Sequence, residues 1–583
     1  MEQKSLLGSL PNQRPKMASR TKHCQLLAIA LFWLWVVFRI GSMLMPSEFQ
    51  TTYLEYDGEK IKWESCGELK NTPLECSTLH VPMDQFDPKK SGDRTFTIPL
   101  IRMRGENATK NLLLNPGGPG GGGFDLIYRM GEHLKVLVGE GFHLVSFDPR
   151  GVNSSTPLAS CYPDAPTRHD LSRVRSWDVL VDSPEIYAWT HNFVQACTET
   201  MGEYAKYINT PQTAADMNSI LDALGQDDMF YWGFSYGSVL GQTYAGMFPE
   251  RSERVIIDGV VDQFEWYGGL FEAYSQVDAD KVLDGFLEEC FKSGDSNCSL
   301  SLLATSKEDL HEKVLSYMEK LREQPISVYI NNTLYGLLDY NQIWYNGVFP
   351  ALLKPYTWSS LAENLHQLMQ GNATAAFLAY GKGEVLSYQH EAYEVVTLND
   401  GLSGPKHWPQ DRKSFLNNDK IISSLNQSLF GPSQHKLLSI RQQWTVPKTH
   451  TYVPRKAVKT ASPLLILSTT YDPVCPLGAA RAAEAGFEGS QVVEVKGYGH
   501  CSPAVPSLCA TKILRQFLYE GHLPQTYTQC EVDLPYFREP RKGNLVSSQK
   551  LFANAEDEEI HFAQLALAKE WKVPEISSTG MLW

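Results

Sequence analysis

Short, unbroken runs of aliphatic and β-branched residues recur along this chain of 583 residues, and segments with helical spacing of apolar positions separate them. Such runs are typical of strands buried on both faces, as in a parallel sheet covered by helices. The predicted strands are residues 61–66, 79–83, 95–103, 111–115, 143–147, 229–234, 254–261, 463–468 and 491–495. The predicted helices between them include residues 211–224, 239–248 and 507–519. This alternation predicts an α/β protein with a mostly parallel sheet flanked by helices.

Residues 262–455 interrupt the alternation of strands and helices. The segment is rich in Trp and Tyr and lacks short buried strands, and its helical patterns cover residues 274–291, 307–321 and 357–368. Because strand-like runs resume after it, we interpret the segment as a large helical cap inserted over the C-terminal edge of the sheet, where ligands bind in such folds. An independent domain is the alternative.

The cap interpretation divides the rest of the chain. Residues 46–261 and 456–536 are predicted to be the two parts of the core. Residues 537–583 form a C-terminal tail, in which the helix-like stretch 560–571 is predicted to be peripheral and shows no recognisable chemistry.

The first 45 residues have the pattern of a membrane-targeting segment. Residues 26–38 are an unbroken apolar run that follows five basic residues and one acidic residue. Since about 20 residues span a bilayer, residues 26–45 are predicted to be an uncleaved signal anchor. Residues 1–25 would then be cytosolic and the body lumenal or extracellular, as in a single-pass type II membrane protein. A cleaved signal peptide, with translation starting at Met17 and a secreted product, is the alternative.

The cysteines and sequons agree with entry into the secretory pathway. Ten of the eleven cysteines follow Cys24, an even number, as paired disulfides require. The predicted local disulfides are Cys66–Cys76, Cys161–Cys197 and Cys290–Cys298. The connectivity stays open for the C-terminal set Cys475, Cys501, Cys509 and Cys530. Asn-x-Ser/Thr sequons predict N-glycosylation at Asn107, Asn153, Asn297, Asn331, Asn372 and Asn426.

The net charge and the spacing of Cys and His residues argue against nucleic acid and metal ions as ligands. The formal net charge of −14 argues against nucleic acid as the main partner. The neighbourhood of Cys501 has neither a Cys-x-x-Cys motif nor a His pair at ligand spacing, so no metal ion and no cofactor is expected.

The segment Gly233-Phe-Ser-Tyr-Gly237 joins a predicted strand to a predicted helix. Gly-x-Ser-x-Gly in this context is the layout of a nucleophile elbow, in which the strained turn exposes the Ser235 hydroxyl. The N–H of Tyr236 would then point at the group that the hydroxyl attacks. The motif alone also fits an ordinary turn flanked by glycines, and the strand before and helix after it favour the nucleophile.

Two residues that follow late strands are candidates to activate this hydroxyl. His500 lies in a Gly-rich loop after the strand at 491–495, and Asp472 follows the strand at 463–468. His500 is the candidate base, and Asp472 is the carboxylate that would orient the imidazole and stabilise its charged form. Taken singly, the first also fits a structural histidine and the second an Asp-Pro turn. Their order after Ser235 and their places at strand ends favour a catalytic triad.

The glycine-rich run after Asn115 is the candidate for the rest of an oxyanion hole. A flexible linker is the alternative, but the run follows a buried strand directly and contains two prolines that stiffen it. Gly118 is the predicted donor, paired with the N–H of Tyr236.

Several of these motifs together resemble one known family. The matching stretches are Asn115-Pro-Gly-Gly-Pro-Gly120, Phe147-Asp-Pro-Arg-Gly151, Ser155-Thr-Pro157, Gly233-Phe-Ser-Tyr-Gly237, Asp472-Pro-Val474 and Gly499-His-Cys501. They resemble the secreted tripeptidyl aminopeptidase-like α/β-hydrolases, relatives of the proline iminopeptidases of peptidase family S33, over most of residues 60–536. The resemblance implies the α/β-hydrolase fold, a C-terminal segment typical of that group, and hydrolysis of an N-terminal di- or tripeptide unit, or of a related amide or ester, by Ser235, Asp472 and His500.

The chain departs from the family pattern in its cap. Relatives often carry cysteines near the places of Leu398 and Arg441, so a cap disulfide is expected to be absent. Relatives commonly have Thr where Cys475 stands, which leaves Cys475 available for a new bridge with Cys501 or Cys509. An aminopeptidase also needs an acidic group for the substrate's α-ammonium, and Glu265 is the candidate among several cap acids.

The sequence is compatible with three functions. The first is a membrane-anchored or secreted serine exopeptidase that releases peptides from free N-termini. The second is an esterase or amidase that acts on a small molecule, since the same triad serves both reactions. The third, a binding protein without catalysis, is disfavoured by the intact triad.

Overall fold

The computed structural model describes residues 53–381, 391–537 and 552–571, so the predicted signal anchor lies outside the described residues. The chain divides into two units, Met1–Tyr53 and Leu54–Trp583, and the fold below is that of the second. Within the described ranges, no helix combines the length and apolar character needed to cross a membrane.

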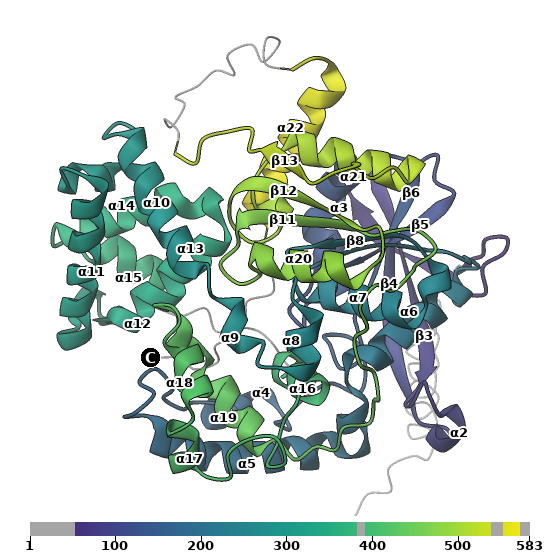
Figure 1. Cartoon of the computed structure of the whole chain (residues 1–583), viewed down its shortest axis with the longest axis horizontal. Coiled ribbons are helices and arrows are strands. Elements are labelled where there is room, and N and C mark those ends of the chain that lie inside the picture. Colours follow the sequence, from purple (N-terminus) through teal and green to yellow (C-terminus); the bar gives the residue numbers. More distant parts are fainter. Residues whose placement is uncertain (1–52, 382–390, 538–551, 572–583) are drawn as a thin grey trace, which may run out of the picture. The chain divides into compact units, whose positions relative to one another are not determined.

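The second unit is built on one large mixed sheet (Figure 1). A two-residue strand, β1 (Tyr53–Leu54), starts the described chain. In spatial order the following strands are β2 (Trp63–Leu69), β3 (Thr72–Pro82), β4 (Thr95–Met103), β6 (Phe142–Phe147), β5 (Lys110–Asn115), β7 (Met229–Phe234), β8 (Ser252–Asp258), β11 (Leu465–Tyr471), β12 (Gln491–Tyr498) and β13 (Thr528–Glu531). The pairs from β2 to β6 are antiparallel, and all pairs from β6 to β13 are parallel.

Helices cover both faces of the sheet, as continuous apolar strands require. They are α3 (Gly123–Val138), α6 (Thr210–Ala223), α7 (Tyr236–Met247), α20 (Leu477–Gly486), α21 (Leu508–Glu520) and α22 (Ala555–Glu570). The connections between the strands also contain α2 (Pro88–Ser91), α4 (Ala165–Leu171) and α5 (Ser183–Met201). Leu112 and Leu114 of β5 belong to a buried cluster with α3, α21 and α22. Leu113 points the other way, into a cluster with α6, α7 and α20, because side chains alternate across a strand.

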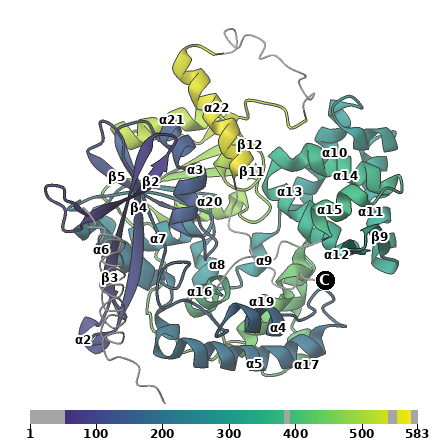
Figure 2. The same cartoon turned by 180° about the vertical axis from the view of Figure 1, so that it is seen from behind.

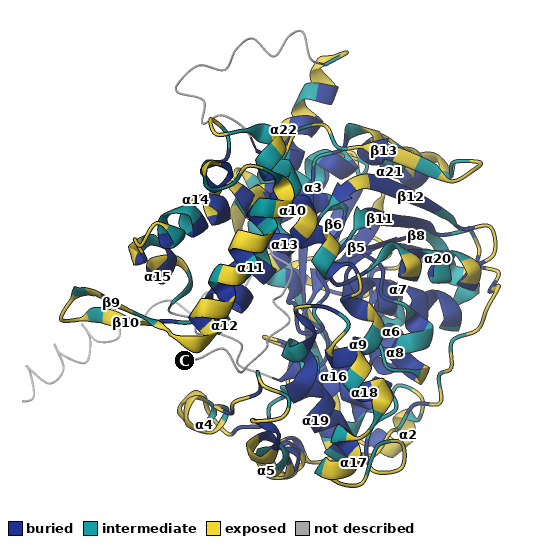
Figure 3. Cartoon of the chain, turned by 60° about the vertical axis from the view of Figure 1, so that its left-hand side comes forward, coloured by how far each residue is buried: buried dark blue, intermediate teal, exposed yellow. Residues whose placement is uncertain are grey.

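Residues 262–455 contain helices and one hairpin. The helices are α8 (Gln263–Gly268), α9 (Glu272–Ser275), α10 (Ala279–Ser293), α11 (Lys307–Glu323), α12 (Tyr340–Ile343), α13 (Phe349–Leu353), α14 (Trp358–Met369), α15 (Thr374–Tyr380), α16 (Ala392–Asp400), α17 (Arg412–Leu416), α18 (Asp419–Leu425) and α19 (His435–Gln443). The strands are β9 (Ile326–Asn331) and β10 (Leu334–Leu338), an antiparallel hairpin with many exposed residues, in contrast to the buried central strands (Figure 3).

Helix α5 comes before this segment in the chain, yet it packs against α17 and α19 (Figure 2). The backbone carbonyl of Tyr187 accepts a hydrogen bond from Gln443 Nε2 (2.9 Å), and Arg412 Nη1 donates to Ser183 Oγ (3.0 Å). The group of helices α5, α17 and α19 therefore combines residues from before and from within 262–455.

Eight cysteines form disulfides in the described residues. Three are the predicted local bridges, Cys66–Cys76, Cys161–Cys197 and Cys290–Cys298. The fourth joins Cys509 to Cys530, so the expected bridge from Cys475 to Cys501 or Cys509 is wrong. The parallel pairing of β13 with β12 brings Cys530 beside α21, where its Cα lies 5.6 Å from that of Cys509.

A buried ion pair fixes the loop after β6 to α6. Arg150 donates from Nε to Asp216 Oδ2 (2.7 Å) and from Nη2 to Oδ1 (2.6 Å), and neither side chain is exposed. Nη1 of Arg150 also donates to the carbonyls of Met83 (2.9 Å) and Tyr207 (3.0 Å). The guanidinium thus holds four parts of the core at one point.

The substitution Arg150→Met tests this contact. It leaves the Asp216 carboxylate buried without its cation, which is expected to lower the free energy of unfolding in urea by about 3–5 kcal/mol. Arg175→Met is the control, because Arg175 pairs with Glu185 on the surface and its loss should not measurably change the urea midpoint. Equal midpoints for the Arg150 variant and the wild type would contradict the assignment.

Candidate active site

Ser235 lies at the turn from β7 into α7 with φ 56° and ψ −122°. A positive φ strains a residue that carries a Cβ, and neighbouring contacts hold this one in place. Its N–H donates to the carbonyl of Asp258 (2.9 Å), and its own carbonyl accepts from the N–H (2.8 Å) and Oγ (2.5 Å) of Ser238. A side chain on Gly233 would collide with the Gly237 carbonyl, so only glycine fits before the turn. This is the predicted elbow geometry.

His500 and Asp472 lie at the same edge of the sheet, after β12 and β11. Their atoms Nδ1 and Oδ2 are 2.7 Å apart, and both side chains are fully buried. Oδ1 of Asp472 accepts from the N–H groups of Val474 (2.9 Å) and Cys475 (2.8 Å), and Oδ2 accepts from that of Cys501 (3.1 Å). The carboxylate is thus fixed from three sides and can hold the tautomer of His500 that carries hydrogen on Nδ1.

Nε2 of His500 is the ring nitrogen left to act as a base. It is buried and has no hydrogen-bond partner within the part of the chain that the structure describes. The bond to Ser235 Oγ that proton transfer requires is therefore not formed here, and such bonds often close only when substrate binds.

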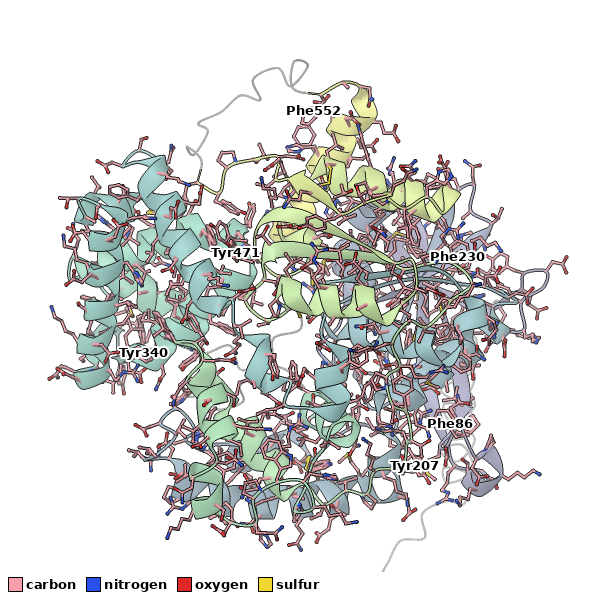
Figure 4. The ribbon with its side chains drawn as sticks, in the orientation of Figure 1. Phe86, Tyr207, Phe230, Tyr340, Tyr471 and Phe552 are labelled. Carbon is pink, nitrogen blue, oxygen red and sulfur yellow. A yellow bond between two sulfur atoms is a disulfide. The ribbon has the colours of Figure 1, made fainter. Side chains whose placement is uncertain are left out.

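The thiol of Cys475 belongs to the same buried cluster as Asp472 and His500. Burial raises its pKa well above the usual value, the charge of Asp472 adds to this, and a hydrogen bond with Ser235 opposes it. Ligating atoms of Asp472, Cys475 and His500 lie within 4.8 Å of one another. Nearby, Tyr471 at the end of β11 stacks on Tyr498 at the end of β12, with ring centroids 5.5 Å apart (Tyr471 is labelled in Figure 4).

The glycine-rich loop after β5 packs directly on the elbow. A Cβ on Gly117 would lie 2.9 Å from Ser235 Cβ and 3.1 Å from the nitrogen of Tyr236. Gly117 and Gly118 have φ of 93° and 110°, and the Gly118–Pro119 peptide is cis. The N–H of Tyr236 belongs to the first turn of α7, where a helix leaves such groups unpaired. The loop and the helix start are therefore adjacent, as an oxyanion hole needs.

Asp258 at the end of β8 connects the elbow with the loop of His500. Besides its carbonyl bond to Ser235, its Oδ1 accepts from the N–H of Ser502 (2.7 Å). Its Oδ2 accepts from Ser502 Oγ (2.6 Å) and Trp232 Nε1 (3.3 Å). Burial raises the pKa of Asp258 to about 6, against the opposing effects of these hydrogen bonds and the charge of His500.

Trp571 reaches the site from the C-terminal tail. Directly after α22, its Nε1 donates to the carbonyl of His500 (3.0 Å), and its ring meets that of Phe234 edge-on, with centroids 5.0 Å apart. Only 2% of Trp571 is exposed, because α22 packs along α3 and carries it inward. This differs from the predicted peripheral tail, and nothing in the sequence around Trp571 indicates the contact.

Residues 262–455 contain a buried acidic group that has one unpaired oxygen. Glu272 is fully buried and its Oε1 accepts from Arg441 Nη2 (2.5 Å), whereas its Oε2 is buried without a partner among the described residues. The same holds for the hydroxyl of Tyr393. Burial raises the pKa of Tyr393 well above its usual value, and the charges of Glu272, Glu394, Arg441 and Cys475 all act on it. The Tyr393 hydroxyl and Glu272 Oε2 are therefore two buried polar groups of this segment without a hydrogen-bond partner among the described residues.

The predicted ammonium ligand, Glu265, lies on α8. It is half-buried on α8 beside Gly269, and burial together with the charge of Asp262 raises its pKa. None of the hydrogen bonds and ion pairs found among the described residues joins it to Ser235, Asp472 or His500. The structure thus pairs His500 with Asp472, and it shows a different cap acid, Glu272, that has a buried carboxylate oxygen without a partner among the described residues.

The predicted glycosylation sites all lie in described residues. Asn297 is half-buried, and its Nδ2 donates to the carbonyl of Ser293 (3.1 Å), so the amide nitrogen is already engaged. The exposed sites are Asn107, Asn153, Asn331, Asn372 and Asn426.

The pH dependence of stability tests the environment of Asp258. Its folded pKa of about 6 exceeds the unfolded value of 3.8, so its contribution to stability is complete below about pH 4 and is lost as the pH rises through 6. About two pKa units correspond to roughly 3 kcal/mol. The free energy of unfolding of the wild type, minus that of Asp258→Asn, should therefore fall by roughly 3 kcal/mol from about pH 4 to about pH 7 in urea titrations. A difference that stays constant with pH would contradict this.

Comparison with known proteins places these residues in context. Residues 110–505 match the family model described as alpha/beta hydrolase fold. The serine protease Hip1 of Mycobacterium tuberculosis is 27% identical, over 81% of this chain and 91% of its own length. The tripeptidyl aminopeptidase of Streptomyces lividans is 23% identical, over 81% of this chain and 86% of its own length. Carboxylesterase B of M. tuberculosis is 26% identical, over 90% and 96% respectively.

Proposed function

This chain belongs to the α/β hydrolase family, and from that membership we propose that it is a serine exopeptidase that cleaves short peptides from free N-termini through an acyl-enzyme intermediate. The observation that carries the proposal is the 2.7 Å contact of His500 Nδ1 with Asp472, at the sheet edge that also holds the strained Ser235. The names of two relatives, a serine protease and a tripeptidyl aminopeptidase, support the peptidase assignment.

The roles follow from the geometry of the three side chains. Ser235 Oγ attacks the scissile carbonyl while His500 Nε2 takes its proton, and the imidazolium then gives that proton to the leaving amine. Asp472 orients the ring and stabilises its charged form. The N–H groups of Tyr236 and Gly118 are proposed to hold the oxyanion, each contributing about 3 kcal/mol to the transition state. Water then releases the peptide by the same route.

The exopeptidase mode requires an anion for the α-ammonium of the substrate. Glu272 offers a buried carboxylate oxygen without a partner, and an unpaired group of this kind costs roughly 1–3 kcal/mol. A tripeptide spans about 10 Å, and the proposal requires Glu272 to lie within that reach of Ser235. We therefore assign the ammonium to Glu272, with the Tyr393 hydroxyl beside it, in preference to Glu265.

An esterase that acts on a small molecule is the second candidate, favoured by the relative named carboxylesterase B. Ser235, Asp472 and His500 would also catalyse ester hydrolysis. The buried carboxylate of Glu272 would then have no part in substrate binding.

We also propose that the body of the enzyme is lumenal or extracellular, either secreted or held by residues 26–45 as a type II signal anchor. Four disulfides and five exposed sequons support an oxidising, glycosylating compartment.

A substrate panel with the Ser235→Ala variant tests the proposed reaction. Peptidyl-coumarins with free N-termini should be hydrolysed and N-blocked ones should not, and the variant should lose roughly 10⁶-fold in kcat. Labelling by a fluorophosphonate should be lost with Ser235. Turnover of p-nitrophenyl esters alone would favour the esterase. If the protein shows no turnover and no labelling, it is a binding protein without catalysis.

The substitution Glu272→Gln tests the ammonium site. Loss of a charge-assisted contact worth about 1.5–3 kcal/mol should raise KM for free-amine peptides roughly 10- to 100-fold. The KM for p-nitrophenyl acetate should stay at the wild-type value, which also reports that the variant is folded. Glu265→Gln is the matched control and should change neither. If Glu265→Gln raises the peptide KM instead, the assignment to Glu272 is wrong.

A further inference from the structure

The thiol of Cys475 has no part in the proposed reaction, although it lies inside the site. Cys475 is a free cysteine, 2% exposed, in the turn after Asp472. It hydrogen-bonds with Ser235, and a ring nitrogen of His500 lies within 4.8 Å of its Sγ. Thiolate and imidazole together are the donors that zinc prefers in proteins.

A second observation, independent of the thiol, points to a ligand here. His500 is fully buried, and its Nε2 has no hydrogen-bond partner among the described residues. With hydrogen on Nδ1, held by Asp472 Oδ2, Nε2 carries a lone pair. A carboxylate behind a ligating imidazole is the usual arrangement around zinc, because it orients the ring and raises its basicity.

We propose that Cys475 and His500, with Asp472 supporting the imidazole, form an inhibitory site for a thiophilic divalent cation, with Zn²⁺ as its natural occupant. The cation takes the lone pair that Ser235 activation needs, so bound Zn²⁺ and hydrolysis exclude each other. The inhibitory effect rests on the proposed function, whereas cation binding does not.

The ligation step is balanced without an oxidant or reductant. The Cys475 S–H bond breaks, its proton leaves to solvent, and a Zn–S bond forms. His500 donates its Nε2 lone pair and loses no proton. Zn–S and Zn–N bonds of about 2.3 and 2.0–2.1 Å at a tetrahedral centre put sulfur and nitrogen roughly 3.6 Å apart, so the imidazole and the thiol need to approach each other when the cation binds. Water fills the remaining positions.

A second free cysteine among the described residues allows the contribution of Cys475 to be isolated. Cys501, the other free cysteine, is directed elsewhere, since its Sγ donates to the carbonyl of Asp258 (3.6 Å). It therefore provides a matched control.

Zinc inhibition of the purified full chain tests the proposal. With free Zn²⁺ set by a chelator buffer and an ester as substrate, Cys475→Thr should weaken inhibition at least 10- to 100-fold relative to its own uninhibited rate. Cys501→Ala should keep the wild-type inhibition constant, and EDTA should restore activity in all three proteins. Equal inhibition of the wild type and Cys475→Thr would overturn the assignment.

Cobalt supplies a readout that does not depend on hydrolysis. Co²⁺ added to the wild type and to Ser235→Ala should give a thiolate-to-metal charge-transfer band, and Cys475→Thr should lack it while retaining the wild-type circular dichroism. No band in the wild type would refute the site, even if the enzyme hydrolyses its substrates. A band in a chain that hydrolyses nothing would keep the site and reject the proposed function.

Discussion

One residue at the end of β8 holds the two halves of the site together. The carbonyl of Asp258 fixes the strained backbone of Ser235, and its carboxylate fixes Ser502, two residues beyond His500. The proposed nucleophile, Ser235, and the proposed base, His500, come from loops far apart in the sequence, and Asp258 connects both loops. The same burial that makes Asp258 rigid raises its pKa, and the anchor is therefore also a group whose charge is costly.

The predictable part of the molecule is the part governed by local patterns. Continuous apolar runs identify the central strands, since burial on both faces leaves no polar alternation, and β4 and β7 have the predicted bounds. In a parallel sheet the carboxyl ends of strands share an edge, so Ser235, Asp472 and His500 could be placed together from their positions after β7, β11 and β12. The contact of His500 with Asp472 agrees with this placement.

The features that the sequence did not predict depend on contacts between distant segments, and local patterns contain no information about such contacts. The strand β13, absent from the prediction, is four residues long with one buried residue, and its pairing with β12 decides the partner of Cys509. The half-buried Glu265 and the buried Glu272 look alike in sequence, and only the fold shows that Glu272 has a buried oxygen without a partner among the described residues. The exposed hairpin of β9 and β10 is likewise invisible to a search for buried strands.

The contact of Trp571 with the loop of His500 forms only after residue 571 has been synthesised. The loop of His500 is held by the cap, through the carbonyl of Leu353 (2.9 Å from the His500 nitrogen), and by the indole of Trp571 from the other side. Ser235, Asp472 and His500 are synthesised first, and Trp571 follows His500 by 71 residues. A nascent chain thus carries the three proposed catalytic side chains before the indole that supports the loop of His500 has been made.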